Sequence, residues 1–125
     1  MRRIDTARHY THNVGVMIGE FEYLLLSAAA RLGDNAYGAS IRAETGKATG
    51  SLCSIGALYT TLDRLEAKGF IETWMGAATA QRGGRPKRMV RITAKGRKAA
   101  AAFYAAIIRA SRGVSWEADE LGVGS

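Results

Sequence analysis

Positive charge gathers in one short stretch, RGGRPKRMVRITAKGRK, at positions 82–98. The stretch holds eight of the eighteen Lys and Arg residues of this 125-residue chain, its only proline and no acidic residue. Arg82, Arg85, Lys87 and Arg88 cluster where the chain turns, and the glycines among them let the backbone come close to a phosphate. Because Lys and Arg bind nucleic acid by neutralising its phosphates, we predict phosphate contacts here. A loop whose charges are merely solvated is the alternative.

A second candidate is one face of a predicted helix in the segment SIGALYTTLDRLEAKGF. Ser54 can cap this helix, and Lys68-Gly69 can end it. The residues expected to face the core are Ile55, Leu58, Leu62 and Leu65. The opposite face is small, hydroxylic and singly basic, and it consists of Ala57, Thr60, Thr61 and Arg64. Such a face can approach base edges in DNA, and an ordinary solvated helix face is the alternative.

Other chemistry receives little support. The sequence shows no set of nucleophile, base and acid and no Gly-rich phosphate loop after a strand, so we expect no enzyme. His9 and His12 stand without cysteine or carboxylate company, so we expect no metal and no cofactor. Cys53, the only cysteine, is interpreted as a filler, with redox sensing as the alternative. Trp74 and Trp116 either pack or stack on an aromatic effector, which leaves a small-molecule effector open.

Composition restricts the classes of partner. Apolar residues make up 47% of the chain, which suffices for one core, and the length suits one domain. The net charge of +7 and the isoelectric point of about 10.0 indicate nucleic acid, an acidic membrane surface or an acidic protein as partner. No apolar run reaches the roughly 18–20 residues of a membrane span. The start lacks the cleavage site of a signal peptide, so we expect a cytoplasmic protein without a membrane partner.

Apolar periodicity predicts the helices that come before the candidate face. A first helix covers about residues 18–32 and ends at Gly33. The segment DNAYGASIRAETG begins with an Asp/Asn capping signal and reads as a short second helix. We expect it to turn Tyr37 and Ile41 inward and to end at Gly46.

Two strands and a long helix follow. FIETW and RMVRIT alternate partly between apolar and polar residues, and the long basic loop between them favours a projecting ribbon. Thr93 can cap a final helix over residues 94–112. The order indicates a mainly α fold with a small β-ribbon, a winged helix-turn-helix plus a C-terminal helix. The expected parts are a flexible basic arm (1–15), the winged helix-turn-helix (16–93), the dimerisation helix (94–112) and a flexible acidic tail (113–125).

The final helix carries more apolar residues than one domain face can use. Phe103, Ile107 and Ala110 can face the domain, which leaves Tyr104 and Ile108 over. A partner helix is the natural use of such a surplus, so we predict a twofold dimer with contacts from Phe103, Tyr104, Ile107 and Ile108. Alanines that merely fill an exposed helix are the alternative.

Three segments carry a family resemblance: GEFEYLLLSAAARLGDNAYGASI, SIGALYTTLDRLEAKGFIE and RGGRPKRMVRITAKGRKA. Over about residues 19–102 the chain resembles the PadR family of bacterial transcriptional regulators. The resemblance implies a dimeric winged-helix repressor whose recognition helix is residues 54–68 and whose wing is residues 82–88. Tyr59 and Tyr37 match aromatic positions of the family, where they either hold the DNA backbone or pack.

The chain also departs from the family pattern. Thr60 stands where many members have proline, so the first turns of the recognition helix can bend differently. The last helix has no tryptophan, so the drug binding of some members is not carried over.

We therefore expect a DNA-binding regulator, a homodimeric repressor that occludes a pseudo-palindromic operator in double-stranded DNA. One alternative is a basic protein that binds nucleic acid without regard to sequence. The other is a winged-helix module that binds an acidic protein.

Overall fold

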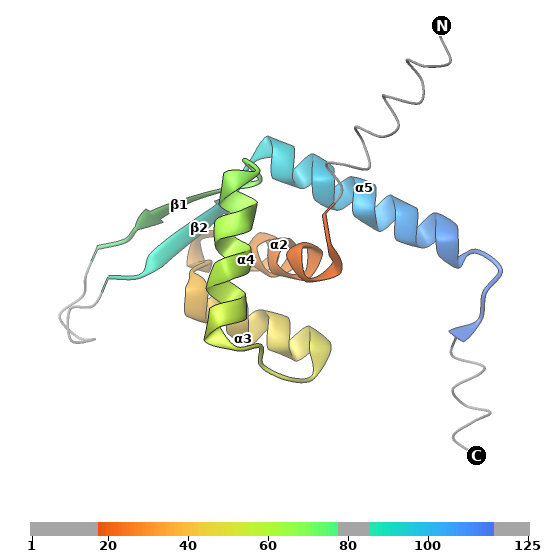
Figure 1. Ribbon diagram of the computed structural model, residues 1–125, viewed down its shortest axis with the longest axis horizontal. Coiled ribbons are helices and arrows are strands. Elements are labelled where there is room, and N and C mark those ends of the chain that lie inside the picture. The colour runs from red at the N-terminus through yellow and green to blue at the C-terminus, as the bar shows by residue number, and fades with distance from the viewer. Residues whose placement is uncertain (1–17, 78–85, 117–125) are drawn as a thin grey trace, which may run out of the picture.

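The computed structural model describes residues 18–77 and 86–116 of the chain. The elements are the helix α2 (Glu20–Leu32), the short 3-10 helix η1 (Gly33–Asn35), the helices α3 (Gly38–Thr49) and α4 (Ile55–Ala67), the strands β1 (Ile71–Met75) and β2 (Arg88–Ile92), and the helix α5 (Ala94–Ser111). Helix α2 lies at the centre, and α3, α4, α5 and β2 pack against it (Figure 1). The expected mainly helical fold with a two-stranded ribbon is confirmed. The predicted arm (1–15) and residues 117–125 of the predicted tail lie outside the described residues.

The hydrophobic core lies where α2, α3 and α4 meet. The large side chains that are fully buried are Leu25, Leu26, Ile41, Leu58, Leu62 and Leu65. Phe70, Ile71 and Val90 extend this core beneath the ribbon. As predicted, α2 is followed by Gly33, whose φ of 58° most other residues would adopt only with strain.

Helix α3 differs from its prediction at both ends. The predicted Asp/Asn cap forms η1 instead, and the hydroxyl of Ser40 accepts a hydrogen bond from the amide of Tyr37 (2.9 Å). The helix runs through Gly46 and ends at Gly50, which has a φ of 89°. A Cβ at position 46 would lie only 2.9 Å from the Leu52 side chain, so glycine makes room for Leu52 there and does not end the helix. Gly50 is therefore the C-cap of α3, whereas the sequence pattern predicted that the helix would end at Gly46.

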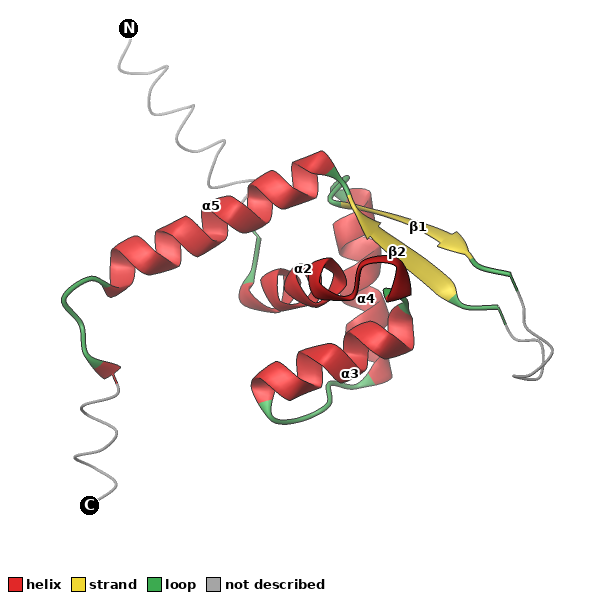
Figure 2. Ribbon diagram, turned by 180° about the vertical axis from the view of Figure 1, so that it is seen from behind, coloured by secondary structure: helices red, strands yellow, loops and turns green. Residues whose placement is uncertain are grey.

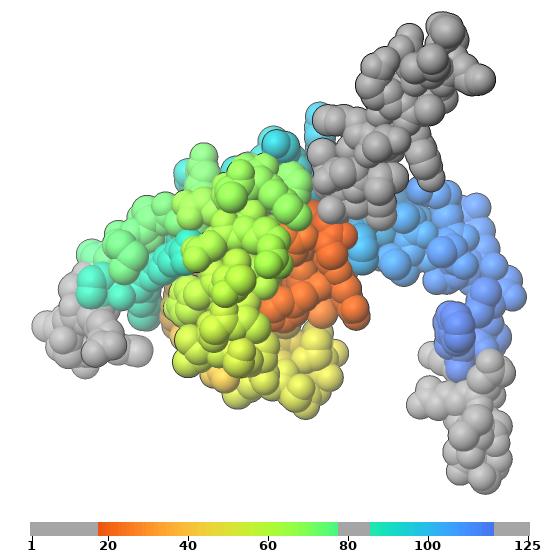
Figure 3. Space-filling model, in the orientation of Figure 1, coloured from red at the N-terminus to blue at the C-terminus, as the bar shows by residue number. Residues whose placement is uncertain are grey.

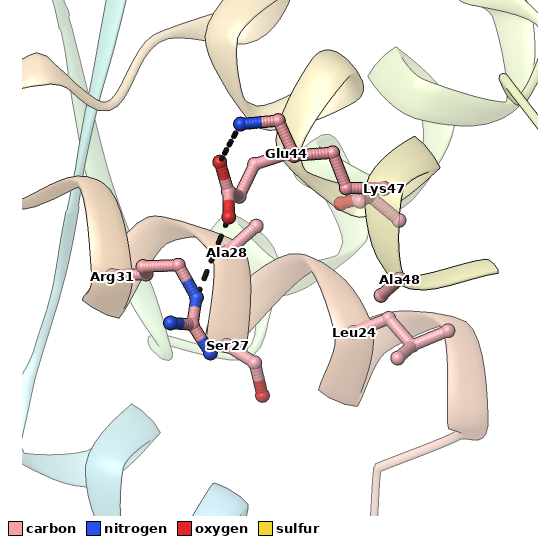
Figure 4. A pocket seen from close by; sticks show the side chains of 8 residues that line it. Leu24, Ser27, Ala28, Arg31, Glu44, Lys47 and Ala48 are labelled. Carbon is pink, nitrogen blue, oxygen red and sulfur yellow. Dashed lines mark hydrogen bonds and ion pairs between the residues drawn. The ribbon is translucent and has the colours of Figure 1, made fainter. Parts of the chain in front are cut away.

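Ion pairs fix α2 to both neighbouring helices. Glu22 is 5% exposed, and its carboxylate accepts from the Gly19 amide (2.7 Å) and from Nζ of Lys68 (2.8 Å to Oε2). This pair joins the first turn of α2 to the end of α4. Glu44 of α3 lies between Arg31 of α2 and Lys47, 3.4 Å from each, beside a shallow pocket of about 240 Å³ (Figure 4).

The ribbon is an antiparallel pair of strands in which Ile71 faces Ile92 and Met75 faces Arg88. It projects from the helical body at the end away from the C-terminal half of α5 (Figures 1 and 2). Ile71 and Val90 are buried toward the helices, whereas Trp74 on the other side is 45% exposed. The alternation of the two strands therefore confirms the predicted projecting ribbon.

Helix α5 begins as predicted, with the hydroxyl of Thr93 accepting from the amide of Gly96 (3.0 Å). Its first half packs on the body, and its second half extends beyond it (Figures 1 and 3). Phe103 contacts Tyr23, with ring centres 4.9 Å apart. Ile107, predicted to face the domain, is 48% exposed, because the helix has passed the end of the body there. Ala110, predicted to face the domain as well, is also exposed.

Within the described ranges, no helix combines the length and the apolar character that a membrane crossing needs.

Candidate nucleic-acid interface

The turn between α3 and α4 is fixed by several local interactions. Gly50 reverses the chain, and Nε of Arg42 donates to the carbonyl oxygen of the half-buried Cys53 (2.7 Å). The hydroxyl of Ser54 accepts from the amide of Ala57 (3.0 Å), which confirms the predicted cap of α4. The turn therefore holds the first residues of α4 in a defined position at the surface.

Helix α4 presents its outer face on the same side of the molecule as the ribbon (Figure 3). Its exposed residues include Ile55, Gly56, Ala57, Thr60, Asp63 and Arg64. Two predictions about its faces are wrong, because Thr61 is 5% exposed and Ile55 is 59% exposed. The two residues flank the Leu58–Leu65 stripe on opposite sides at similar angles, so only packing against α2 and α3 decides between them. The hydroxyl of Thr61 is thus not part of the surface.

An apolar patch at the start of α4 was not predicted from the sequence. Leu52 and Ile55 are each 59% exposed at the turn and at the first residue of the helix. Apolar side chains in such a place can contact the methyl groups of thymines. The signal that could have indicated Ile55 was its place in the first helical turn, where a side chain reaches beyond the neighbouring helices.

Two tyrosines join the helices to the ribbon. Tyr59 is half-buried against Gly38, where an added Cβ would collide with the Tyr59 hydroxyl. Tyr37 forms an isolated antiparallel bridge with Met89 of β2, and Nζ of Lys87 lies 4.3 Å from the centre of its ring. The Tyr37 ring therefore lies beside the ribbon, and the Tyr59 ring lies between α4 and α3 with the guanidinium carbon of Arg88 5.9 Å from its centre.

The basic residues of the ribbon fall into two groups. Arg88 is bound to carboxylates of α4, with Nη2 lying 2.9 Å from Oδ1 of Asp63 and 3.0 Å from Oε1 of Glu66. Among the described residues, neither Lys87 nor Arg64 forms an ion pair. The predicted phosphate contacts Arg82 and Arg85 lie outside the described residues. Arg64 is thus an exposed cation and Lys87 a half-buried one over the Tyr37 ring, whereas Arg88 is held by carboxylates of α4.

A helix-turn-helix whose second helix is exposed beside a basic β-ribbon defines a winged-helix DNA-binding protein. A family model described as "Transcriptional regulator PadR-like family" matches residues 25–102, which is more than half of the chain. The chain therefore belongs to the PadR-like family, and it is a DNA-binding transcriptional regulator. No curated protein matches it significantly in sequence.

Solved structures share the fold at low sequence identity. A PadR family transcriptional regulator from Eggerthella lenta is 18% identical, with 90% of each chain covered and a TM-score of 0.58. MepR of S. aureus in complex with DNA is 17% identical over 86% of this chain and 72% of that chain, with a TM-score of 0.53. BpsR of Bordetella bronchiseptica, whose DNA binding is regulated by 6-hydroxynicotinic acid, is 17% identical over 94% of this chain and 89% of that chain, with a TM-score of 0.54.

Proposed function

We propose that the protein is a homodimeric repressor that binds a pseudo-palindromic operator in the cytoplasm and blocks transcription by occlusion. The observation that carries this proposal is the outer face of α4, which is exposed next to the basic ribbon (Figure 3). A helix can enter the major groove while a basic ribbon follows the neighbouring backbone.

Residues of α4 supply the sequence readout in this proposal. Ala57 and Thr60 are small enough to let the helix approach base edges, and Arg64 can reach a guanine or a phosphate. Ile55 adds an apolar contact for thymine methyl groups. Ser54 caps the helix, whose first amides then point toward the DNA backbone.

Phosphate binding is assigned to the wing, a name used from here on for the whole ribbon (β1, β2 and the segment that joins them) and not only for residues 82–88. Lys87 lies at the end of this segment, next to β2. Arg82 and Arg85 belong to the same basic cluster in the sequence, so we assign phosphate contacts to them as well. Tyr37 supports the contact by its backbone bridge to Met89 of β2, and Tyr59 supports it through its ring, which lies 5.9 Å from the guanidinium carbon of Arg88.

Dimerisation is proposed through α5. Tyr104, Ile107 and Ile108 are 56%, 48% and 44% exposed in the single chain, and they follow one another along one side of the helix. Phe103 is left out of this surface because it packs on Tyr23 of its own domain. Twofold symmetry predicts half-sites whose centres lie about 10 bp apart.

Selection from a random pool of DNA duplexes, followed by footprinting upstream of the protein's own gene, tests this function. We expect the selected site to bind at least about 10³-fold more tightly than random DNA at physiological salt. A ratio near one would indicate a protein that binds nucleic acid without regard to sequence. No binding to any duplex at low salt would indicate an interaction module.

Two substitutions separate the proposed roles. Arg85→Ala should weaken binding to all duplexes similarly and lower the salt slope by about 0.9, because one phosphate contact is lost. Arg64→Ala should instead reduce the preference for the selected site, at a cost of about 1–3 kcal/mol if it reads a base. Equal effects of both variants on selected and random DNA would contradict the assignment of base readout to α4.

A further inference from the structure

A cluster of four side chains joins the wing to the recognition helix α4, and we call it the wing clamp. It consists of Asp63 and Glu66 on α4, Thr73 on β1 and Arg88 on β2. Nη2 of Arg88 lies 2.9 Å from Oδ1 of Asp63 and 3.0 Å from Oε1 of Glu66. The hydroxyl of Thr73 donates to the other oxygen of Glu66 (2.8 Å). Both strands of the ribbon are therefore attached to a single carboxylate of α4.

The position of Arg88 separates it from the other cations of the basic stretch. Its side chain is only 21% exposed, and its guanidinium carbon lies 5.9 Å from the centre of the Tyr59 ring on the same helix. Side chains alternate along a strand, so Arg88 points toward α4 while its neighbours Lys87 and Met89 point to the other face of the ribbon. Nη2 of this guanidinium is already bound by two carboxylates, whose negative charge opposes the approach of a phosphate to it.

We propose that Arg88 is a positioning residue that sets the angle between the wing and α4, and not a phosphate contact. The proposal rests on the DNA-binding function proposed above. A protein that contacts the backbone with its wing and the bases with α4 gains affinity when both parts are held in the binding geometry beforehand. The wing clamp supplies this geometry through charge-assisted hydrogen bonds, which are stronger than neutral ones.

The proposal predicts an unusual effect on DNA affinity when the carboxylate of Glu66 is removed. In a protein whose ligand is DNA, removal of a carboxylate near the binding surface should raise affinity, since it removes repulsion of the phosphates. If Glu66 instead anchors both strands of the ribbon, its removal should lower affinity. The sign of this change therefore distinguishes a clamp from a general charge effect.

The first experiment compares two arginines of β2 in the full-length chain. Arg91 pairs with Glu72 (2.6 Å) on the outer face of the ribbon and touches no acid of α4, so Arg91→Gln is the matched control for Arg88→Gln. With the duplex selected by the wild-type protein, R88Q should bind roughly fivefold to tenfold more weakly. Its salt slope should equal that of the wild type. A slope lower by about 0.9 in R88Q would show a phosphate contact and overturn the proposal.

The second experiment removes the partner carboxylates. Glu66→Ala should weaken binding by a similar factor, whereas the control Glu72→Ala, with the same change of charge, should leave binding unchanged or strengthen it. The double variant R88Q/E66A should lose less than the product of the two single losses, because both substitutions break one interaction. Unchanged or tighter binding by E66A, or fully independent losses, would refute the clamp.

A third measurement needs no DNA and keeps the clamp separate from the proposed function. Spin labels on cysteines at Ala57 and Ala77, with Cys53→Ser as background, report the distance between α4 and the wing when labelled chains are diluted by excess unlabelled protein. R88Q should broaden this distance distribution, and R91Q should not. A wild-type protein that binds no duplex would refute the proposed function alone, and an unchanged distribution in R88Q would refute the clamp alone.

Discussion

Replacement of Ile108 by Asp should dissociate the proposed dimer. Ile108 is 44% exposed on α5, next to Tyr104 (56%) and Ile107 (48%). Full burial of a large apolar side chain contributes about 1.5–3 kcal/mol, so covering the exposed half of each one contributes about 1 kcal/mol. Three side chains from each of two protomers then give about 6 kcal/mol, which is one part of the gross contact energy that must exceed an association cost of about 4–15 kcal/mol.

Ile108→Asp removes about 2 kcal/mol of this sum over both protomers and places two carboxylates in an apolar contact. Burial of an unpaired charge costs at least several kcal/mol. The dissociation constant should therefore rise by at least about 10³-fold, since each 1.4 kcal/mol is a factor of ten. Sedimentation velocity at micromolar concentration should show a dimer for the wild type and a monomer for the variant. The affinity of the variant for the full operator should also fall, because a monomer contacts only one half-site.

Ala102→Asp is the matched control for this experiment. Ala102 is exposed on the same helix, about a third of a turn around the axis from Ile108 and on the opposite side from Tyr104. A102D should remain a dimer. If I108D sediments like the wild type, or if both variants dissociate equally, the apolar side of α5 is not the dimer surface.

Four further substitutions test which contacts stabilise the fold. Ser54→Ala removes the hydroxyl that caps α4 and should lower the free energy of unfolding by about 1 kcal/mol in urea denaturation. Gly96→Ala should cost about 1–3 kcal/mol, because the new Cβ would collide with the carbonyl oxygen of Phe70, while Gly56→Ala, with open space around it, should stabilise α4 by about 0.5–1 kcal/mol. Equal shifts in melting temperature for these two alanine variants would contradict this reasoning. Thr45→Val should raise stability by about 1 kcal/mol, since the buried Thr45 hydroxyl has no hydrogen-bond partner among the described residues; a lower melting temperature would show that the hydroxyl is satisfied.

The wing clamp changes the meaning of the basic stretch at positions 82–98. Composition treats its cations as equivalent, but Arg88 is bound by Asp63 and Glu66, and Arg91 is bound by Glu72. The count of eight Lys and Arg residues in this stretch thus overstates the number of cations that a phosphate can reach freely. Lys87 and Arg64 form no ion pair with any described residue, and they are the better candidates for DNA contact.

Local features of the fold could be predicted because they depend on neighbouring residues. The spacing of Leu58, Leu62 and Leu65 places them on one side of a helix whatever surrounds it. Ser54 and Thr93 act as caps because their hydroxyls reach amides three residues later in the same chain. The family segments were predictable for the same reason, since they record local patterns of turns, caps and apolar positions.

Predictions from the sequence were wrong where two residues matched the same local pattern equally well. Gly46 and Gly50 both offer a helix end, but Gly50 has the positive φ of a cap, and Gly46 instead makes room for Leu52. Ile55 and Thr61 flank the same apolar stripe, and packing buries the threonine and leaves the isoleucine exposed. The burial of Thr61 is decided by packing against parts of the chain outside α4, which no pattern within the helix encodes.

The sequence by itself determined the order of the elements, the basic character of the wing and the membership in a family of DNA-binding regulators. Periodicity and composition carry this information because helix faces, caps and charge runs are properties of short segments. Only the tertiary structure decided which cations are accessible. The partners of Arg88 lie 22 and 25 positions earlier in the chain, and they meet it because the ribbon turns that side of β2 toward α4. Such a meeting depends on strand register and helix docking, which no local pattern encodes.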